Sequence, residues 1–385
     1  MAPKTPSKLR ILFYSDLHFS DAHASEAQSA IRCLIRWVGV LKPNLLVNLG
    51  DTFHQKDNVS TLTLSLVAES FRELRDSLPS TTIHFGISGN HDIAVRDGSR
   101  SAADVLRLAW VSMAPSGSVL DAFGFKLGWL GYVEDAAKRQ EAIEAIREAD
   151  VLFAHAPFLG AKFNAKQSEE GSTALDPSRL GPSLLVVGHY HHPQVLRTKT
   201  CETIIVGSPA YYTWGDSVTF LEAEGGDVDS KGKVGDIVPR GFLLLELSRA
   251  EEGSMSWQAT RLRNENARVL MTVDSRGAAS RAADVASVHN GQSISYRVTG
   301  SEADEVAGVL TEVFKDRTNI RVTTRSSLKP SGLPTGPEAV DFQVGDVDYG
   351  KLLDRVLQET TFDGVAVEDV KKVAKRILEQ SHATA

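Results

Sequence analysis

Five separated segments of the sequence carry side chains that could hold metal ions, and each segment directly follows a short apolar run. The side chains are Asp, Asn and His, whose oxygen and nitrogen atoms together suit Mn²⁺, Fe²⁺ or Zn²⁺ better than Ca²⁺. They are Asp16 and His18 in SDLHFS, Asp51 in LGDTFH, Asn90 and His91 in SGNHD, His155 in DVLFAH, and His189 and His191 in VGHYHHP. The sequence therefore predicts a metal site assembled from five loops.

The spacing of these residues suggests how two ions could be held. Asp16 with His18, and His189 with His191, lie two residues apart, and a strand that runs into a loop can project such pairs in one direction. One bridging carboxylate can hold two ions ~3.5–4 Å apart, and Asp51, alone between the two pairs, is the natural bridge. Each of the five motifs alone could be a turn or a packing feature. The five motifs together favour a two-metal site.

The elements that must position these residues follow from apolar patterning. Apolar runs at 10–15, 45–50, 82–89, 150–155, 184–189, 203–208 and 241–248 predict short buried strands. Helical periodicity at 31–41 and 64–78 predicts helices between the first three strands, with Ser25 and Gln28 at capping-box spacing and Pro43 ending the first helix. Alternating strands and helices predict an α/β domain with a parallel or mixed sheet covered on both faces. Ligands bind such sheets at the carboxyl ends of the strands.

Beyond this domain, which we place at 8–250, the pattern changes. Residues 256–326 read as strands with one helix at 304–314, which predicts a small α+β domain. Residues 327–346 contain three prolines and three glycines and read as a linker. Residues 347–381 carry two amphipathic stripes, which fit either docking into the groove of a partner or packing on the small domain.

Composition limits the classes of function. The net charge of -7 over 385 residues argues against non-specific nucleic-acid binding through a broad basic surface. The two cysteines, Cys33 and Cys201, are expected to pack in the core, as in a reducing compartment. The sequence contains neither a signal peptide nor an apolar run long enough to span a membrane. We therefore expect a cytoplasmic protein without a membrane partner.

The ordered motifs resemble the calcineurin-like metallophosphoesterase superfamily. Its blocks DxH, GD, GNH, H and GHxH correspond to residues 16–18, 50–51, 89–91, 155 and 188–191. GDTFH with His54, and GNHD with Asp92, are similar to the SbcD and meiotic-recombination-eleven type DNA repair nucleases. The arginine that follows GD in the superfamily's protein phosphatases is missing here. The resemblance extends weakly to the small domain, which is similar to the family's capping domain, whereas the insert at 224–238 departs from the family pattern.

This resemblance implies a four-layer α/β/β/α fold, a small α+β capping domain and C-terminal helices. It also implies two divalent ions, which we expect to be Mn²⁺. One ion would be held by Asp16, His18, Asp51 and His191, and the other by Asp51, Asn90, His155 and His189. His91 would contact the phosphate and help to protonate the leaving oxygen, with Asp92 orienting it. His54 would position the DNA backbone, or else hold its own loop through a hydrogen bond.

The implied function is a two-metal DNA nuclease, with 3′–5′ exonuclease activity on duplex DNA and endonuclease activity on single strands. It would act in DNA repair, recombination or replication as a homodimer, with an ABC-type coiled-coil ATPase of the SbcC type as its partner. The residues leave two alternatives open. One is a phosphodiesterase or phosphatase acting on nucleotides or small phosphoesters, and the other is a non-catalytic scaffold for DNA or the ATPase. His23, His84, His289 and His382 lie outside the motifs, and we expect them to be surface or core residues.

Overall fold

Two six-stranded sheets contain the strands that carry the predicted ligands. The computed structural model describes residues 7–56, 58–164, 167–216, 239–273, 282, 286, 291–300 and 302–324. The first sheet has the order β14-β13-β1-β2-β3-β4, and β1 to β4 run parallel. Its strands are β1 (Ser7–Tyr14), β2 (Leu45–Asn48), β3 (Ile83–Gly86), β4 (Ser112–Met113), β13 (Gly241–Arg249) and β14 (Met255–Arg263).

The second sheet has the order β11-β12-β10-β7-β6-β5. Its four central strands run parallel, and β5 and β11 pair antiparallel at its edges. Its strands are β5 (Ser118–Ala122), β6 (Phe125–Leu130), β7 (Val151–Ala154), β10 (Leu184–Val187), β11 (Gln194–Arg197) and β12 (Glu202–Ile205). Parallel strands in both sheets follow from their continuous apolar runs, which require burial on both faces.

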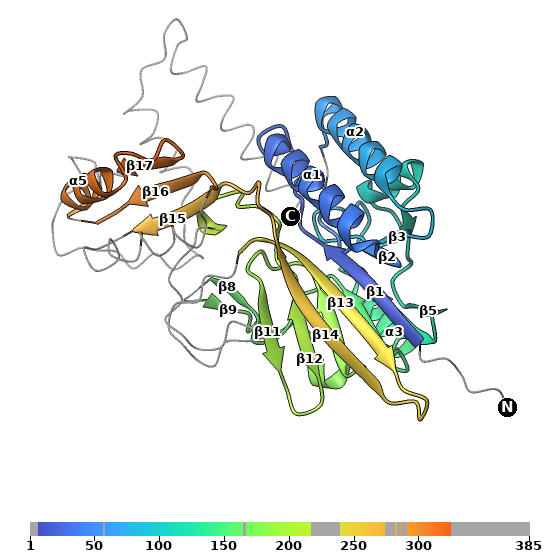
Figure 1. Cartoon of the computed structure of the whole chain (residues 1–385). Coiled ribbons are helices and arrows are strands. Elements are labelled where there is room, and N and C mark those ends of the chain that lie inside the picture. Colours follow the sequence, from blue (N-terminus) through green and yellow to red (C-terminus); the bar gives the residue numbers. More distant parts are fainter. Residues whose placement is uncertain are drawn as a thin grey trace, which may run out of the picture. The chain divides into compact units, whose positions relative to one another are not determined.

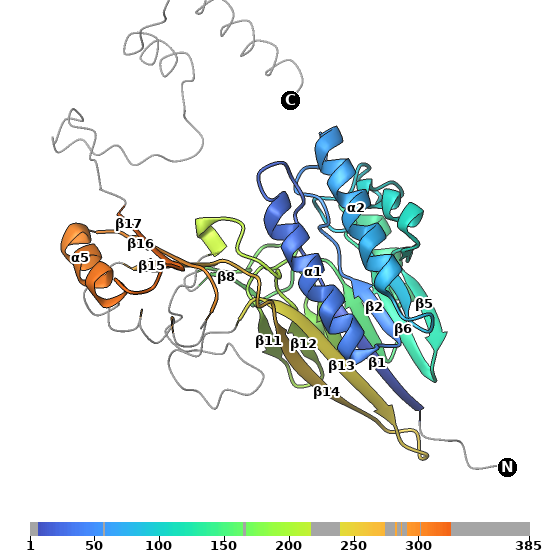
Figure 2. The same ribbon diagram turned by 45° about the horizontal axis from the view of Figure 1, so that its top comes forward.

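Four layers result from the way these sheets are covered. Alternate residues of β1 point to opposite faces: Leu12 lies in the core beneath the helices, whereas Phe13 lies in the core between the sheets. Phe13 packs edge-to-face on Phe153 of the second sheet, with ring centroids 5.0 Å apart. Helices α1 (Ala24–Leu41) and α2 (Thr61–Ser77) cover the first sheet (Figures 1 and 2), and α3 (Ala136–Ala145) packs on the second. The predicted α/β/β/α fold is confirmed.

The ends of α1 test the predicted helix signals. Lys42 closes the helix in a left-handed conformation (φ 47°) directly before Pro43, so the predicted end of the helix is confirmed. The capping-box prediction was wrong, because the helix begins at Ala24 and places Ser25 inside the first turn. The Ser25 hydroxyl donates to the Glu26 carboxylate at 2.7 Å, so it caps no backbone N–H group.

A third sheet forms a separate core. It consists of three parallel strands, with α5 (Ala303–Val313) connecting the second to the third. The strands are β15 (Val269–Val273), β16 (Ile294–Val298) and β17 (Ile320–Thr324). Tyr296, Leu310 and Phe314 pack inside this core. The strand that we expected at the start of the small domain instead pairs with β13 along its whole length as β14, because the chain turns back directly after β13. The domain boundaries themselves stay a prediction.

Several elements had no counterpart in the sequence reading, and several predictions lie outside the described residues. The unassigned elements are β4, β5, β6, α3, β8 (Lys162–Asn164), β9 (Gln167–Ser168), β11 and the 3-10 turns η1 (Ala102–Ala109), η2 (Pro177–Arg179) and η3 (Trp214–Asp216). The linker at 327–346, the helical stripes at 347–381 and the insert at 224–238 lie outside the described residues. Both cysteines are buried, as expected. Within the described part of the chain, no helix has the length and apolar character needed to cross a membrane.

Candidate metal centre

The predicted ligands lie in loops at the carboxyl ends of β1, β2, β3, β7 and β10. Backbone hydrogen bonds join the first two loops: Asp16 N–H donates to the Gly50 carbonyl at 2.9 Å, and His18 N–H donates to the Asp51 carbonyl at 3.0 Å. The two sheets pack face to face, so the loops from both meet at one edge of the core. The edge of a doubly covered α/β sheet is where ligands bind.

The first group of donors consists of Asp16, His18 and His191, each with one ligand atom within 4.8 Å of the other two. The Nε2 atoms of His18 and His191 lie 2.9 Å apart. Asp16 is fully buried, and its Oδ2 atom has no hydrogen-bond partner. A buried carboxylate oxygen without a donor is costly, and a cation beside the two imidazoles would satisfy it.

The second group consists of Asp51, His155 and His189, again within 4.8 Å of one another. Asn90 joins it, because its Oδ1 lies 2.8 Å from His189 Nδ1 and 3.1 Å from His155 Nε2. His155 Nδ1 lies 2.6 Å from the Leu49 carbonyl. Donation to that carbonyl puts the ring proton on Nδ1 and leaves the Nε2 lone pair facing the group, as is usual for metal-binding histidines.

Asp51 connects the two groups. Its Oδ2 atom lies 3.8 Å from His18 Nε2 in the first group and 3.3 Å from His155 Nε2 in the second. Its Oδ1 atom accepts a hydrogen bond from His91 N–H at 2.8 Å. This is the placement that a bridging carboxylate requires. The structure thus brings all seven predicted ligands together, while their role as ligands stays a prediction.

The protonation preferences of the histidines fit cation binding. Burial lowers the pKa of His18 well below its usual value, and burial with the nearby His155 lowers the pKa of His189 to about 3. Both shifts favour the neutral ring, the form in which histidine binds metals. Burial alone would also lower the pKa of His155, but the Asp51 carboxylate raises it to about 9. A cation would displace the proton that Asp51 attracts to this ring. The donors present fit a pair of divalent ions.

The loop backbones are bent tightly to achieve this arrangement. Asp16, His18, Asp51 and His189 have φ angles of 54°, 46°, 52° and 83°, in the left-handed region that L-residues rarely occupy. Gly89 allows the second and third loops to touch, because a Cβ there would lie 2.1 Å from Asp51 Oδ1. Four of the described non-glycine residues with a left-handed backbone are thus predicted ligands, and such strained residues are typical of functional sites.

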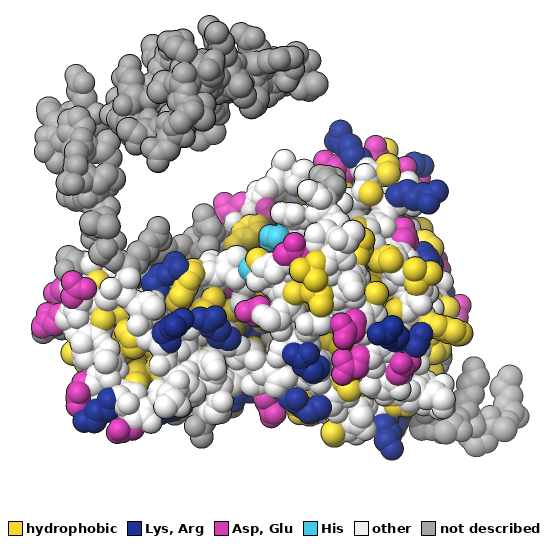
Figure 3. Space-filling view, turned by 90° about the horizontal axis from the view of Figure 1, so that it is seen from above, with side chains coloured by type: hydrophobic (Ala, Val, Ile, Leu, Met, Phe, Trp, Pro, Cys, Tyr) yellow, Lys and Arg dark blue, Asp and Glu magenta, His cyan; other side chains and the backbone are white. Residues whose placement is uncertain are grey.

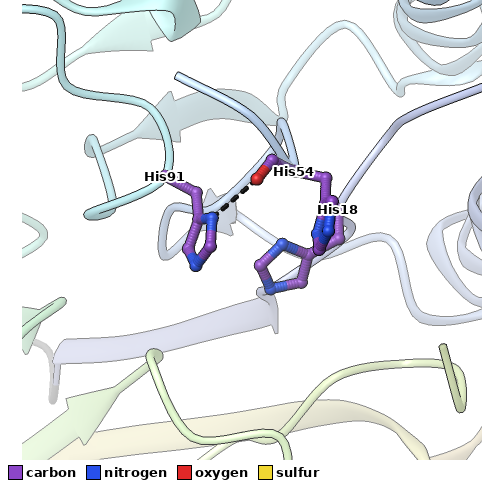
Figure 4. A group of neighbouring side chains, drawn as sticks. All are labelled: His18, His54 and His91. Atoms are coloured by element: carbon purple, nitrogen blue, oxygen red, sulfur yellow. Dashed lines mark hydrogen bonds between the residues drawn. The ribbon is translucent and has the colours of Figure 1, made fainter. Parts of the chain in front are cut away.

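His91 and His54 lie beside the first group, at the edge of the metal centre. The His91 ring is 4.9 Å from the His18 ring, measured between centroids, and 5.7 Å from the His54 ring, with which it is stacked. His91 Nδ1 lies 2.6 Å from the His54 carbonyl (Figure 4). The backbone of His54, rather than its side chain, therefore orients His91.

The structure gives Asp92 a different place from the one that we expected. Its carboxylate is fully buried and accepts hydrogen bonds from the N–H groups of Phe53 at 3.0 Å and Gly89 at 2.9 Å. Both oxygens thus hold loop backbones together, and neither of these bonds reaches the His91 ring. Asp92 fixes the loops that carry Asp51 and Asn90, and the orienting contact with His91 that we had expected is made by the His54 carbonyl.

Asp216, which was not predicted from the sequence, lies behind His191. Its Oδ1 atom lies 2.5 Å from His191 Nδ1, and its Oδ2 atom accepts the backbone N–H of Thr213 at 2.9 Å. The side chain of Arg240, 2% exposed, donates to the Asp216 carbonyl at 2.8 Å. Asp216 thus fixes the proton of His191 on Nδ1 and directs Nε2 toward His18.

Replacing Asp216 with asparagine is expected to weaken the binding of one Mn²⁺ ion by about 10–100-fold and to spare the other. The amide can still accept the Thr213 N–H bond with its oxygen, but it then turns its NH₂ group toward His191 and forces the ring proton onto Nε2. Calorimetric titration with Mn²⁺ would measure both affinities, with Asp121→Asn on the exposed edge strand β5 as the control. An equal loss at both sites, or no loss, would contradict this positioning role.

His23 and Tyr212 were also missed. The His23 ring, which we expected to be a surface or core residue unconnected with the site, lies 5.5 Å from the rings of His54 and Tyr212. Tyr212 stands 5.7 Å from His18, and its buried hydroxyl has no hydrogen-bond partner. His84, by contrast, is a core residue as expected, bonded to the Tyr14 hydroxyl at 2.8 Å. His289 and His382 lie outside the described residues.

Comparisons with known proteins give one family match. Residues 9–193 match the family model described as calcineurin-like phosphoesterase, and no curated protein matches the chain. This segment contains all the predicted ligands. Over these residues the chain therefore carries a calcineurin-like phosphoesterase domain.

Two solved structures have low similarity to the chain. A protein designated a 5′-nucleotidase from Staphylococcus aureus, in complex with alpha-ketoglutarate, is 16% identical with a TM-score of 0.40 over 67% of this chain and 54% of that chain. This chain thus spans about half of that protein's length. GAP50, the anchor in the inner membrane complex of Plasmodium, is 11% identical with a TM-score of 0.38 over 86% of this chain and 100% of that chain. Both TM-scores are below 0.5, so neither likeness informs the function.

Proposed function

We propose that this protein is a two-metal DNA nuclease of the SbcD type, with exonuclease activity on duplex ends and endonuclease activity on single strands. The observation that carries the proposal is the convergence of seven donors in two groups around Asp51, with His91 and His54 beside them. Manganese is the ion that we expect. When bound, the two cations would offset the charge of a phosphodiester and make a nearby water easier to deprotonate.

The protein's own residues would orient the phosphodiester. The His54 carbonyl holds His91 through Nδ1, so the Nε2 edge of the ring is the one available to a phosphate oxygen. A protonated His91 could then donate from Nε2 to the leaving oxygen. Asp92 and Gly89 keep the loops close enough for Asp51 and Asn90 to face the same substrate atoms.

Two hollows that meet at His54 support an extended substrate rather than a compact one. One, of ≈ 550 Å³, is lined by residues that include Lys56, Asn90 and His91. The other, of ≈ 370 Å³, runs past His23 to the start of α2, and His54, Gln55 and Asn58 line both. On the face in Figure 3, basic side chains lie scattered among acidic ones and form no continuous patch. A strand whose backbone crosses His54 fits such hollows, with affinity supplied by the cations and by a partner.

A panel of substrates with purified protein and Mn²⁺ tests the proposal. We expect loss of label from the 3′ end of linear duplex DNA, nicking of single-stranded circles, and slow turnover of a chromogenic phosphodiester. Chelation with EDTA should stop all three reactions, and Mn²⁺ should restore them. Rapid hydrolysis of cyclic nucleotides or 5′-nucleotides without cleavage of DNA would instead establish the small-phosphoester alternative. No hydrolysis at all with Mn²⁺ bound would favour the scaffold.

We also propose a coiled-coil ABC-type ATPase as the partner, bound by the C-terminal stripes at 347–381. The net charge of -7 suits a subunit that takes its DNA affinity from a partner. Removal of residues 345–385 is expected to abolish pull-down of such an ATPase and to leave hydrolysis of the chromogenic phosphodiester unchanged. Pull-down by the truncated protein would contradict this role of the C-terminal segment.

A homodimer is proposed through α2. The candidate residues are Leu62, Leu64 and Leu66, of which Leu62 and Leu64 are 55% and 39% exposed and Leu66 is half-buried. Changing Leu62 and Leu64 to glutamate is expected to shift the protein from dimer to monomer in sedimentation velocity, because each charge would be buried at the interface. A protein that is monomeric before the change, or dimeric after it, would rule out this surface.

A further inference from the structure

Three histidines form a third cluster, of which only His18 also belongs to one of the two metal groups. His18, His54 and His91 each offer one ring nitrogen within 4.8 Å of the other two. They come from the loops after β1, β2 and β3, and Figure 4 shows their rings gathered in one place. His18 is buried, with 2% of its surface exposed, whereas His54 and His91 are partly exposed, so the cluster can be reached from solvent.

Each ring in this cluster has a nitrogen that the protein leaves for a ligand. His18 faces His191 through Nε2, and its Nδ1 is buried without a hydrogen-bond partner. His54 Nδ1 is likewise buried without a partner. His91 Nδ1 lies 2.6 Å from the His54 carbonyl, and a neutral ring that donates there keeps its lone pair on Nε2. Buried imidazole nitrogens without partners are costly, and a shared cation would satisfy them.

The separations of the rings suit one shared ion. Within the cluster the ring centroids lie 5.4 Å (His18–His54), 4.9 Å (His18–His91) and 5.7 Å (His54–His91) apart. The two histidines of the first metal group lie 4.8 Å apart, and those of the second lie 5.2 Å apart. Two imidazoles on a tetrahedral ion with metal–nitrogen distances of about 2.0–2.1 Å have centroids about 5 Å apart. The ring separations in the cluster are therefore similar to those in the two predicted sites.

We propose that His18, His54 and His91 form a third cation site, selective for Zn²⁺ over Mn²⁺. Each of the two other groups contains a carboxylate, whereas this cluster has imidazole nitrogens only. Such a site suits Zn²⁺, and Mn²⁺ is the weakest binder of the first-row series. His18 would lie between two ions, with one nitrogen toward each, and would release its ring proton to solvent when the third ion binds.

Occupation of this site would affect the proposed nuclease directly. His91 could not donate to a leaving oxygen while its Nε2 is bound to zinc, and His54 could not contact the DNA backbone. The site would therefore be inhibitory, so that Zn²⁺ in excess of the two ions stops hydrolysis. This consequence rests on the proposed function, but the binding of a third ion does not.

The number of bound ions tests the proposal without reference to activity. After equilibrium dialysis of the full chain, elemental analysis is expected to find two Mn²⁺ ions or three Zn²⁺ ions per protein. His54→Gln should hold two ions of either kind, and His91→Gln should do the same. His23→Gln removes a histidine beside His54 that is not in the cluster, and it should still hold three Zn²⁺ ions.

The outcomes separate this proposal from the proposed function. Equal numbers of Mn²⁺ and Zn²⁺ in the unaltered protein would overturn the third site, as would three Zn²⁺ ions retained by both His54→Gln and His91→Gln. Two Mn²⁺ ions in each variant show that the fold and the two-metal site are intact. Fewer than two Mn²⁺ ions in the unaltered protein would count against the two-metal nuclease, while an additional Zn²⁺ ion that depends on His54 would still support the third site.

Discussion

Asp51→Asn is expected to lower phosphodiester hydrolysis by about 10³–10⁴-fold and to prevent the stable binding of both metal ions. Each ion contributes several kcal/mol of charge stabilisation in the transition state, and the Asp51 carboxylate faces both groups, with Oδ2 at 3.8 Å from His18 and 3.3 Å from His155. The amide keeps the size of the side chain but removes its charge. Hydrolysis of a chromogenic phosphodiester at saturating Mn²⁺, with elemental analysis of bound metal, would measure both effects.

The control for this variant is Asp121→Asn, which removes one carboxylate from exposed strand β5. It should keep both ions and full activity. If Asp51→Asn still bound two ions and hydrolysed the phosphodiester at a rate near that of the unaltered protein, Asp51 would not be the bridge, and the two donor groups would have to act separately.

His91→Ala is expected to keep both ions and to lower DNA cleavage by about 10²–10⁴-fold, the usual contribution of a general acid. His91 lies at the edge of the first group, and its Nδ1 contacts the His54 carbonyl rather than a predicted metal ligand. The loss should be smaller with a p-nitrophenyl phosphodiester, because p-nitrophenolate leaves without taking up a proton. Gel assays on DNA and absorbance assays on the chromogenic substrate would compare the two losses.

Two other results would contradict this role of His91 as a general acid. Equal losses on both substrates would show that His91 binds phosphate and does not protonate the leaving oxygen. A loss of metal together with activity would show that the His91 side chain supports the ligand loops, although only its N–H group contacts Asp51.

Patterns local in sequence predicted most of the core architecture. The runs before Asp16, Asp51 and His155 are mostly apolar because their strands are buried on both faces, and such runs are visible in sequence. The region between residues 95 and 149 was not assigned, since β5 is an exposed edge strand and α3 has only a narrow buried stripe. The pairing of β14 with β13 depends on tertiary structure, so the sequence did not distinguish it from a strand of the small domain.

In the metal centre, too, contacts that depend on tertiary structure could not be predicted from the sequence. The ligand positions were predictable because each is tied to a strand end by its own short motif. The contact between Asp216 and His191 spans 25 residues of sequence and requires the segment after β12, residues 206–216, to return to the metal centre. His23 was dismissed because it belongs to no motif, yet the turn before α1 brings it to His54. Asp92 lay in a motif, but its partners are backbone groups of two different loops, which no motif encodes.

The left-handed backbone at four of the predicted ligands links the lifetime of the protein to its metal supply. Each such residue costs about 1–2 kcal/mol relative to an ordinary conformation, and glycine, which would relieve that cost, has no side chain to bind an ion. A cation that binds only the folded loops offsets the cost by mass action. In a cell short of divalent metal, the protein would therefore become easier to unfold and to degrade, so that its abundance and its activity would decline together.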